Sequence, residues 1–172
     1  MSGIATALGG SKATLWNYFP SKEVLFNAVM DRATRDFHAR LSVILSTRGD
    51  VETTLRSFCT EYLRKVLAPE GIALYRLVIS EANRFPEVGR IFFDRGPKAT
   101  QEQLSDYLSG MMNRGLLRKA DPLLTARQLL GLCLSGSHLR LLTGLIDKVT
   151  PELIEEDVER TIDIFMRGYT PD

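Results

Sequence analysis

Residues 3–26 read GIATALGGSKATLWNYFPSKEVLF, and glycine, serine and proline divide this stretch into three helix candidates. A short first helix ends at Gly9 and the glycine after it, because glycine readily takes the positive φ of a helix stop. Ser11 has the side chain of an N-cap and opens a second short helix. Pro20 ends that helix, and Ser21 begins the third, which is long. The stretch therefore predicts two short helices and a turn, joined directly to a long helix.

The rest of the chain is predicted to be helical throughout. Each long segment repeats its apolar residues at three- and four-residue spacing, and none shows the sustained alternation of a strand. The third helix keeps this spacing from Glu23 to about Leu45. The sequence therefore predicts an all-α fold. Proline, glycine and capping residues separate the later helices, and Asp50, Asp121 and Thr150 are the expected caps. We expect these helices over residues 51–66, 72–85, a turn or two from 86, 97–113, 123–142 and 151–168.

The length and composition of the chain are those of an ordinary globular protein. It has 172 residues, of which 44% are hydrophobic and 25% charged, so it can bury a core without a disulfide or a structural metal. Cys59 and Cys133 fall within apolar helical patterns, where we expect buried reduced thiols. The longest apolar run, residues 129–145, is interrupted by serine, glycine, histidine and arginine. We therefore expect a cytoplasmic protein without a membrane segment or a secretory leader.

The opening stretch resembles the DNA-binding signature of the TetR family of transcriptional regulators. In that family a positioning helix and a glycine-containing turn precede a recognition helix that ends in an aromatic-x-Tyr-Phe pattern. Here these parts correspond to residues 4–5, Gly9 and residues 11–19, and residues 21–26, SKEVLF, start the helix that leads into a regulatory domain. All the parts occur in order and at the family's spacing. The resemblance implies a helix-turn-helix head with its linker helix over residues 1–45.

The second short helix is then the one expected to read DNA. Its small and polar side chains leave one face able to enter the major groove of an operator. Residues 1–48 carry six basic side chains against three acidic ones, which attracts a polyanion to this end of the chain. Capping alone would also explain Ser11, and packing alone would also explain Trp16 and Tyr18. The residues expected to contact double-stranded DNA are Ser11, Lys12, Ala13, Thr14, Trp16, Asn17, Tyr18 and Lys22.

The chain departs from the family pattern at three points. Trp16 replaces the usual tyrosine of the recognition helix, and Gly10 replaces a β-branched residue, which should loosen the turn. The family also places a further helix ahead of the residues with which this chain begins, where it covers apolar side chains such as Ile4 and Leu8. Because those side chains need cover, we expect these residues to belong to a longer protein that includes this helix, rather than to a protein that has lost it. The alternative is a ligand-binding or protein-interaction module with a degenerate DNA-binding head.

The C-terminal half resembles one subgroup of the same family, the AefR-like regulators. The resemblance rests on residues 74–97, LYRLVISEANRFPEVGRIFFDRGP, on residues 107–132, YLSGMMNRGLLRKADPLLTARQLLGL, and on residues 141–145, LLTGL. It implies a helical bundle over residues 46–172 that binds a small-molecule effector and forms a homodimer through its last two long helices. The predicted helix 123–142 supports the dimer independently, since its leucines point in all directions and need cover on all sides.

Two sets of residues are candidates for these roles, although ordinary core packing is the plainer explanation of each pocket candidate. Large side chains that could wall the effector pocket are Phe58, Tyr62, Tyr75, Ile79, Phe92, Tyr107, Met111 and His138. Apolar side chains of the last two long helices that could meet a second copy are Leu130, Leu134, Leu141, Ile154, Val158, Ile162 and Phe165.

No pattern typical of an enzyme occurs in the sequence. It lacks a phosphate-binding glycine loop, a Cys-x-x-Cys pair, a metal-type cluster and a nucleophile elbow. Ser137 and His138 are adjacent in the chain and so lie on different faces of a helix, unable to act together as a catalytic pair. We expect a transcriptional repressor that a small molecule releases from its operator, without enzymatic activity, cofactor or metal.

Overall fold

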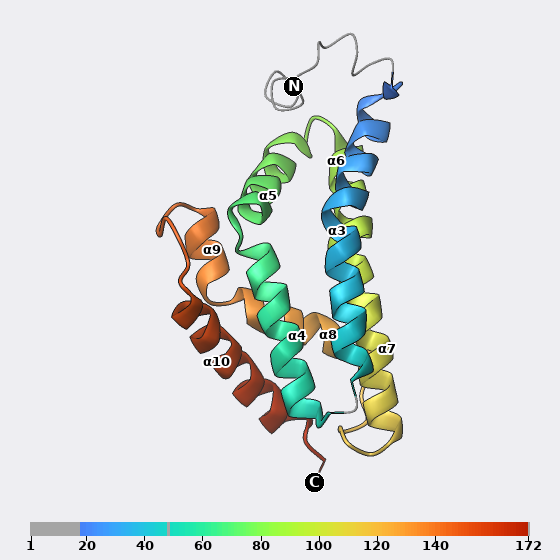
Figure 1. Ribbon diagram of the computed structural model, residues 1–172, viewed down its shortest axis with the longest axis vertical. Helices are drawn as coiled ribbons and strands as arrows, with labels where there is room; N and C mark the ends of the chain where they lie inside the picture. The colour runs from blue at the N-terminus through green and yellow to red at the C-terminus, as the bar shows by residue number, and fades with distance from the viewer. Residues whose placement is uncertain (1–17, 48, 172) are drawn as a thin grey trace.

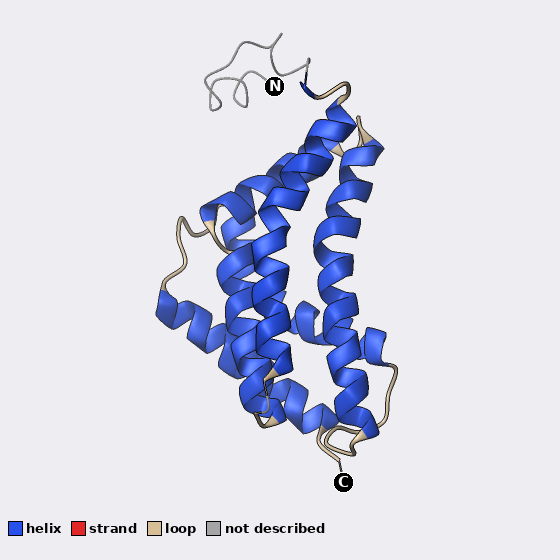
Figure 2. Cartoon of the chain, turned by 45° about the vertical axis from the view of Figure 1, so that its right-hand side comes forward, coloured by secondary structure: helices blue, strands red, loops and turns tan. Residues whose placement is uncertain are grey.

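The computed structural model describes residues 18–47 and 49–171, and over these residues the secondary structure is helical, without a strand (Figure 1; Figure 2). The predicted all-α class is confirmed. None of the described helices is long and apolar enough to span a bilayer. In chain order the elements are α3 (Lys22–Ser46), α4 (Val51–Val66), α5 (Pro69–Glu81), α6 (Pro86–Phe93), the π-helix η1 (Asp94–Lys98), α7 (Ala99–Asn113), α8 (Pro122–Leu134), α9 (Ser137–Leu142) and α10 (Pro151–Tyr169).

Four helices begin at capping residues that the sequence predicts. The side chain of Ser21 accepts a hydrogen bond from the backbone N–H of Val24 at 3.2 Å, which caps α3. Asp50, Asp121 and Thr150 cap α4, α8 and α10 in the same way. In addition, α5, α6, α8 and α10 start with proline, which lacks the N–H group that a first helical turn leaves unpaired. Local chemistry therefore determines where most of these helices start.

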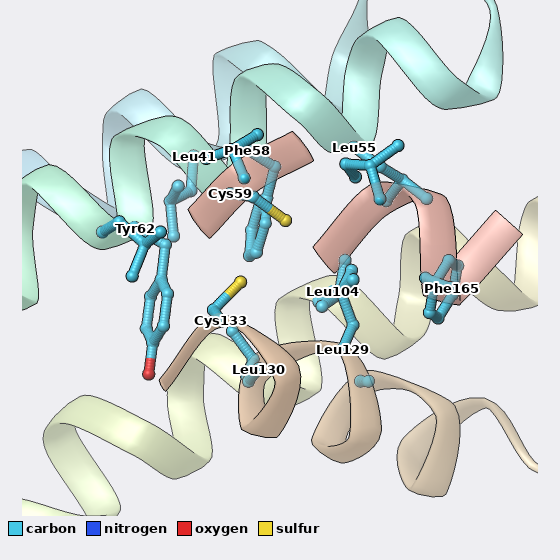
Figure 3. Close-up of a cluster of buried hydrophobic side chains, with 14 of the residues drawn as sticks. Leu41, Leu55, Phe58, Cys59, Tyr62, Leu104, Leu129, Leu130, Cys133 and Phe165 are labelled. Atoms are coloured by element: carbon cyan, nitrogen blue, oxygen red, sulfur yellow. The ribbon is translucent and has the colours of Figure 1, made fainter. Parts of the chain in front are cut away.

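The core lies around α4, which packs against α3, α8 and α10. Leu55, Phe58 and Cys59 of α4 are fully buried, and Figure 3 shows them across the core from Leu129 and Cys133 of α8. Each large apolar side chain buried in this way contributes about 1.5–3 kcal/mol to stability. Both cysteines are buried and free, as the sequence predicts. The core thus holds α4 between the N-terminal and C-terminal helices.

The linker helix α3 shares this core with the regulatory half. It packs against α4, α6, η1 and α7 (Figure 1), and its Phe37 belongs to the central cluster of buried side chains. Ion pairs also join α3 to its neighbours: Glu23 pairs with Arg90 of α6 at 3.1 Å, and Asp31 pairs with Arg95 of η1. A movement of α6 or η1 would therefore act on α3.

The sequence predicts that a new helix starts at Gly96-Pro97, and this prediction is wrong. Instead, α6 continues through the π-helical turn η1 into α7. Pro97 has no N–H group, and its ring crowds the carbonyl four residues earlier, so an ordinary α-helical turn is disfavoured here. The wider π-turn accommodates the proline, and turns of this kind often occur at functional sites.

The single long helix predicted over residues 123–142 is wrong, because two helices occupy this segment. α8 ends at Leu134 and α9 starts at Ser137. Between them Gly136 has φ −93° and ψ −106°, and a Cβ added there would collide with the carboxylate of Asp157 on α10. That carboxylate accepts a hydrogen bond from the Ser137 N–H at 2.9 Å. A buried acid on another helix therefore holds the break, which the periodicity of the segment itself cannot reveal.

Candidate functional site

The residues predicted to contact DNA fall mostly outside the described part of the chain. Of the two described, Tyr18 is 77% exposed, and the Lys22 ammonium lies 4.3 Å from the centre of the Phe85 ring. Lys22 stands in the first turn of α3, where the free N–H groups and the helix dipole favour a phosphate. The other six lie outside the described residues, and their contacts stay predictions: Ser11, Lys12, Ala13, Thr14, Trp16 and Asn17.

A cavity of about 110 Å³ adjoins α3, and α4, α5, α6, η1 and α7 complete its wall. Four aromatic rings line it: Phe37, Tyr62, Tyr75 and Phe92. Tyr75 and Phe92 meet edge to face, with their ring centres 5.0 Å apart. Most of the lining is apolar, which suits a small molecule that contains an apolar ring.

Two threonines on α3 and α7 supply part of the polar lining. Thr34 donates a hydrogen bond to the carbonyl of Met30 at 2.9 Å, and Thr100 donates to the carbonyl of Gly96 at 3.0 Å. With its one proton engaged, the Thr100 hydroxyl accepts from Nε2 of His38, 3.2 Å away. Because both hydroxyl protons bond to helix carbonyls, these threonines offer the cavity acceptors rather than free donors.

Two charged side chains also line the cavity, Lys65 at the end of α4 and Glu70 at the start of α5. Lys65 is half-buried and Glu70 is exposed, and neither belongs to an ion pair among the described residues. Burial, followed by the positive charge of Lys65, lowers the pKa of His38. The ammonium group of Lys65 therefore acts on His38 of α3 as a positive charge, and it has no ion-pair partner among the described residues.

Tyrosine hydroxyls add donors at the same cavity. Burial raises the pKa of Tyr62 and of Tyr75, so both hydroxyls keep their protons at neutral pH. The two phenols also lie near enough for the charge of an ionised Tyr75 to raise the pKa of Tyr62. Lys65 is three residues after Tyr62 on α4, and this spacing places both on one helix face. The cavity thus combines an apolar wall with one charged and two neutral donors.

Three of the eight side chains predicted to wall a pocket line this cavity: Tyr62, Tyr75 and Phe92. Ile79 does not, because it lies on the outer face of α5 and is 60% exposed, whereas Val78 takes the buried face. The other four do not line the cavity: two are buried and two, Tyr107 and Met111, are half-buried against the core, as is usual for large side chains in a helical stripe. These are Phe58, Tyr107, Met111 and His138.

Three polar lining residues, Thr34, Lys65 and Thr100, are not predicted from the sequence. Each is an ordinary helix residue in the sequence, and only the packing of α3, α4 and α7 brings the three to one cavity. The one available signal was the three-residue spacing of Lys65 from Tyr62, which places a cation beside a predicted pocket residue.

Most of the residues predicted to meet a second copy are instead buried in the core of the single chain. The apolar stripe of α10 packs against α4, and Leu134 and Ile154 are half-buried against the same core. A helix stripe identifies the face that is buried, and here the chain itself covers that face. The prediction therefore needs correction for Leu130, Leu141, Val158, Ile162 and Phe165, which are at most 6% exposed.

The apolar surface that remains open lies on other faces of α8 and α10. Leu124 of α8 is 52% exposed and Ile164 of α10 is 56% exposed. Gly131 and Leu132 of α8 and Gly168 of α10 line a shallow hollow with Ile164. Because glycine has no side chain, another backbone could approach closely at this surface.

Comparison with known sequences relates both halves of the chain to one family. Residues 53–171 match the family described as AefR-like transcriptional repressor, C-terminal domain. Residues 1–29 match the family described as bacterial regulatory proteins, tetR family. No curated protein matches the chain significantly.

Solved structures agree with this relation. A structure described as a TetR-family transcriptional regulator from Mesorhizobium loti MAFF303099 is 25% identical, covers 97% of this chain and 84% of its own, and superposes with a TM-score of 0.85. The flavonoid-responsive regulator FrrA is 32% identical over 99% of this chain and 86% of its own, with a TM-score of 0.76. A TetR-family regulator from Pseudomonas syringae pv. tomato, 23% identical, shares the fold with a TM-score of 0.77 over 99% of this chain and 85% of its own. The chain therefore belongs to the TetR family of transcriptional regulators and has an AefR-like C-terminal domain.

Proposed function

We propose that this protein is a homodimeric repressor that leaves its DNA operator when a small molecule occupies the cavity beside α3. The observation that carries the proposal is the position of α3. Its first turn bears Lys22, the candidate phosphate contact, and residues further along the same helix, Met30, Thr34 and Phe37, line the cavity. One continuous helix thus connects the DNA-reading end with the ligand site.

Coupling between the two sites follows from the contacts of α3. An α-helix moves nearly as a rigid rod, so a ligand that displaces Phe37 also shifts Lys22. The pairs Asp31–Arg95 and Glu23–Arg90 connect the same helix to η1 and α6. Because Gly96 of η1 also lines the cavity, a ligand acts on α3 directly and through this second wall. If the two DNA-binding heads of the dimer change their separation, they no longer match operator half-sites that lie one DNA turn apart.

The open apolar surface of α8 and α10 is the proposed dimer interface. Leu124 and Ile164 would be covered by the same residues of a second copy, as expected for an interface around a twofold axis. A twofold dimer presents two recognition helices to a near-palindromic operator.

The effector that we propose is a small molecule with an apolar aromatic ring. Phe37, Tyr62, Tyr75 and Phe92 provide ring faces and edges for it. A relative with 32% identity is named for its response to flavonoids, which are ring compounds, and this name supports the same class of ligand here. The match of residues 1–29 to the DNA-binding part of the family favours a regulator over a ligand-binding module with a degenerate head.

DNA binding is tested by gel shift of the full-length protein on the promoter region of its own gene. The protein should retard this fragment in the presence of excess unrelated DNA at moderate salt. Lys22→Ala should weaken binding to all sequences and reduce its salt dependence, because a phosphate contact is lost. Lys148→Ala, in the acidic C-terminal region, is the matched control and should bind normally. If the full-length protein shows no sequence preference, the proposed function is wrong.

The proposed interface is tested by sedimentation velocity at micromolar concentration. The protein should sediment as a dimer, and Ile164→Asp should yield monomers of 19.3 kDa because a buried unpaired carboxylate opposes association. Ile79→Asp places the same charge on an exposed isoleucine of α5 and should remain dimeric. A monomeric wild-type protein, or a dimeric Ile164→Asp variant, would exclude this interface.

A further inference from the structure

We propose that the effector is a weak acid that binds as an anion. Its charged oxygen, from a carboxylate or a phenolate, would lie at Lys65, Tyr62 and Tyr75, and its apolar ring would lie against Phe37 and Phe92. This inference rests on the proposed function, since it names the chemical class of the molecule that the cavity takes.

The first support is the position of Lys65. Its side chain is half-buried, lines a largely apolar cavity, and has no carboxylate within 4.0 Å among the described residues. A half-buried ammonium without a carboxylate partner is available to an anion that enters the cavity. The ammonium also lies close enough to His38 of α3 to contribute, after burial, to the lowered pKa of that histidine.

Nearby acids do not neutralise this charge. Glu61, four residues before Lys65 on α4, pairs instead with Arg40 of α3. Glu70 lines the cavity but is exposed, and it stands in the first turn of α5, where the helix dipole and water already stabilise a carboxylate. The positive charge is thus left for a ligand.

The tyrosine hydroxyls provide the remaining donors for an anion. Figure 3 shows the Tyr62 ring extending away from the sulfur atoms of the core, with its hydroxyl at the far end. Hydrogen bonding does not contribute to the raised pKa of Tyr62 or Tyr75, so both phenol protons are available. Hydrogen bonds to a charged group stabilise a complex more than hydrogen bonds between neutral groups do.

The threonines help to set the orientation of the ligand. Thr34 and Thr100 have engaged their protons with helix carbonyls and present lone pairs, which repel an anionic oxygen. An acid should therefore place its charged end toward α4 and α5. A neutral hydroxyl elsewhere on the same ring could donate to Thr34 or Thr100.

The test compares acids with neutral analogues of the same shape by isothermal titration calorimetry of the full chain. The probes are 2-naphthoate against 2-naphthamide for a carboxylate, and 4-nitrophenolate against 4-nitroanisole for a phenolate. At least one acid should bind about tenfold more tightly than its neutral analogue, as one charge-assisted hydrogen bond provides. The better of the two acids identifies the oxygen that the site prefers.

Three variants locate the effect. Lys65→Met keeps most of the side-chain volume and should abolish the preference for the acid without weakening the neutral analogue. Tyr62→Phe keeps the ring and should reduce the preference by a smaller factor. Glu70→Gln is the matched control at the other charged lining residue, and the preference for the acid should persist or increase. Thermal unfolding of each variant shows that it is folded.

The proposal is overturned if acids and neutral analogues bind equally, if neither binds, or if Lys65→Met retains the preference. Gel shift of the full-length protein on its promoter fragment distinguishes these results from a failure of the proposed function. Normal operator binding with no preference for acids would remove the ligand class alone. Absence of operator binding would instead count against the proposed repressor, whatever the calorimetry shows.

Discussion

The two halves of α4 differ in what surrounds them. Leu55 and Phe58 in the first half are fully buried among side chains of the central core (Figure 3). Tyr62 and Lys65 in the second half face a cavity that contains an unneutralised charge. One helix therefore has a packed section, where contacts produce stability, and a section where contacts are left open for a ligand. Because these sections are separate, stability and ligand binding should respond to different substitutions.

The largest expected effect tests the packed section. Phe58→Ala should lower the free energy of unfolding by about 3–5 kcal/mol, because it removes a fully buried ring and leaves a void. Phe92→Ala, at the cavity, should lower it by about half as much or less, because one side of that ring already lacks packing partners. Urea unfolding measures both. Equal losses would mean that the cavity wall is as tightly packed as the core and would remove the contrast between the two sections.

The same contrast shows how far the sequence predicts the fold. Ser21, Asp50, Asp121 and Thr150 cap helices where the sequence places them, since a cap depends only on residues a few positions apart. The break at Gly136 was missed because it depends on a carboxylate from another helix. The sequence therefore predicts features that depend on neighbouring residues, whereas it does not predict a feature that two distant segments form together.

The site was predictable to a smaller extent for the same reason. Periodicity predicts that aromatic residues in a helical stripe are buried, but it does not distinguish Phe58, which lies in the core alone, from Tyr62, which belongs to the core and also borders the cavity. It also assigned Val158 and Ile162 to a dimer interface, although α4 of the same chain covers that face of α10. Polar lining residues such as Thr100 carry no signal until the helices are packed.

An intermediate effect is expected at the break between α8 and α9. Gly136→Ala should destabilise the protein by about 1–3 kcal/mol, because the new methyl group collides with the buried Asp157 carboxylate. Gly110→Ala in α7 is the matched control: no atom lies within 4 Å of the added Cβ, and alanine favours the helix by about 0.5–1 kcal/mol. Thermal unfolding compares the two. A neutral Gly136→Ala variant would show that the Asp157 carboxylate makes room for a side chain at no cost, and it would contradict this explanation of the break.

The smallest expected effect concerns pH and sharpens the comparison at the cavity. His38 and His138 are the two histidines of the chain, and burial lowers the pKa of each below the ordinary value of 6.5. A base with a lowered pKa binds protons less readily in the folded than in the unfolded state. Stability is therefore complete above pH 6.5 and declines as the pH falls through 6.5 toward the lower folded pKa values.

Only His38 has a second cause for its lowered pKa, the charge of Lys65. Lys65→Met should therefore raise the pKa of His38 and leave that of His138 unchanged, with each imidazole signal followed by NMR titration and assigned from the His38→Gln and His138→Gln variants. The same substitution should make the loss of stability between pH 7 and pH 5 smaller, since the folded protein then binds a proton more readily. If His38 titrates unchanged in Lys65→Met, the ammonium group of Lys65 does not act on α3, and the positive charge of the second half of α4 has no effect on that helix. A change in the pKa of His38 alone would show that the charge of Lys65 acts near the second half of α4, where we propose that the ligand binds.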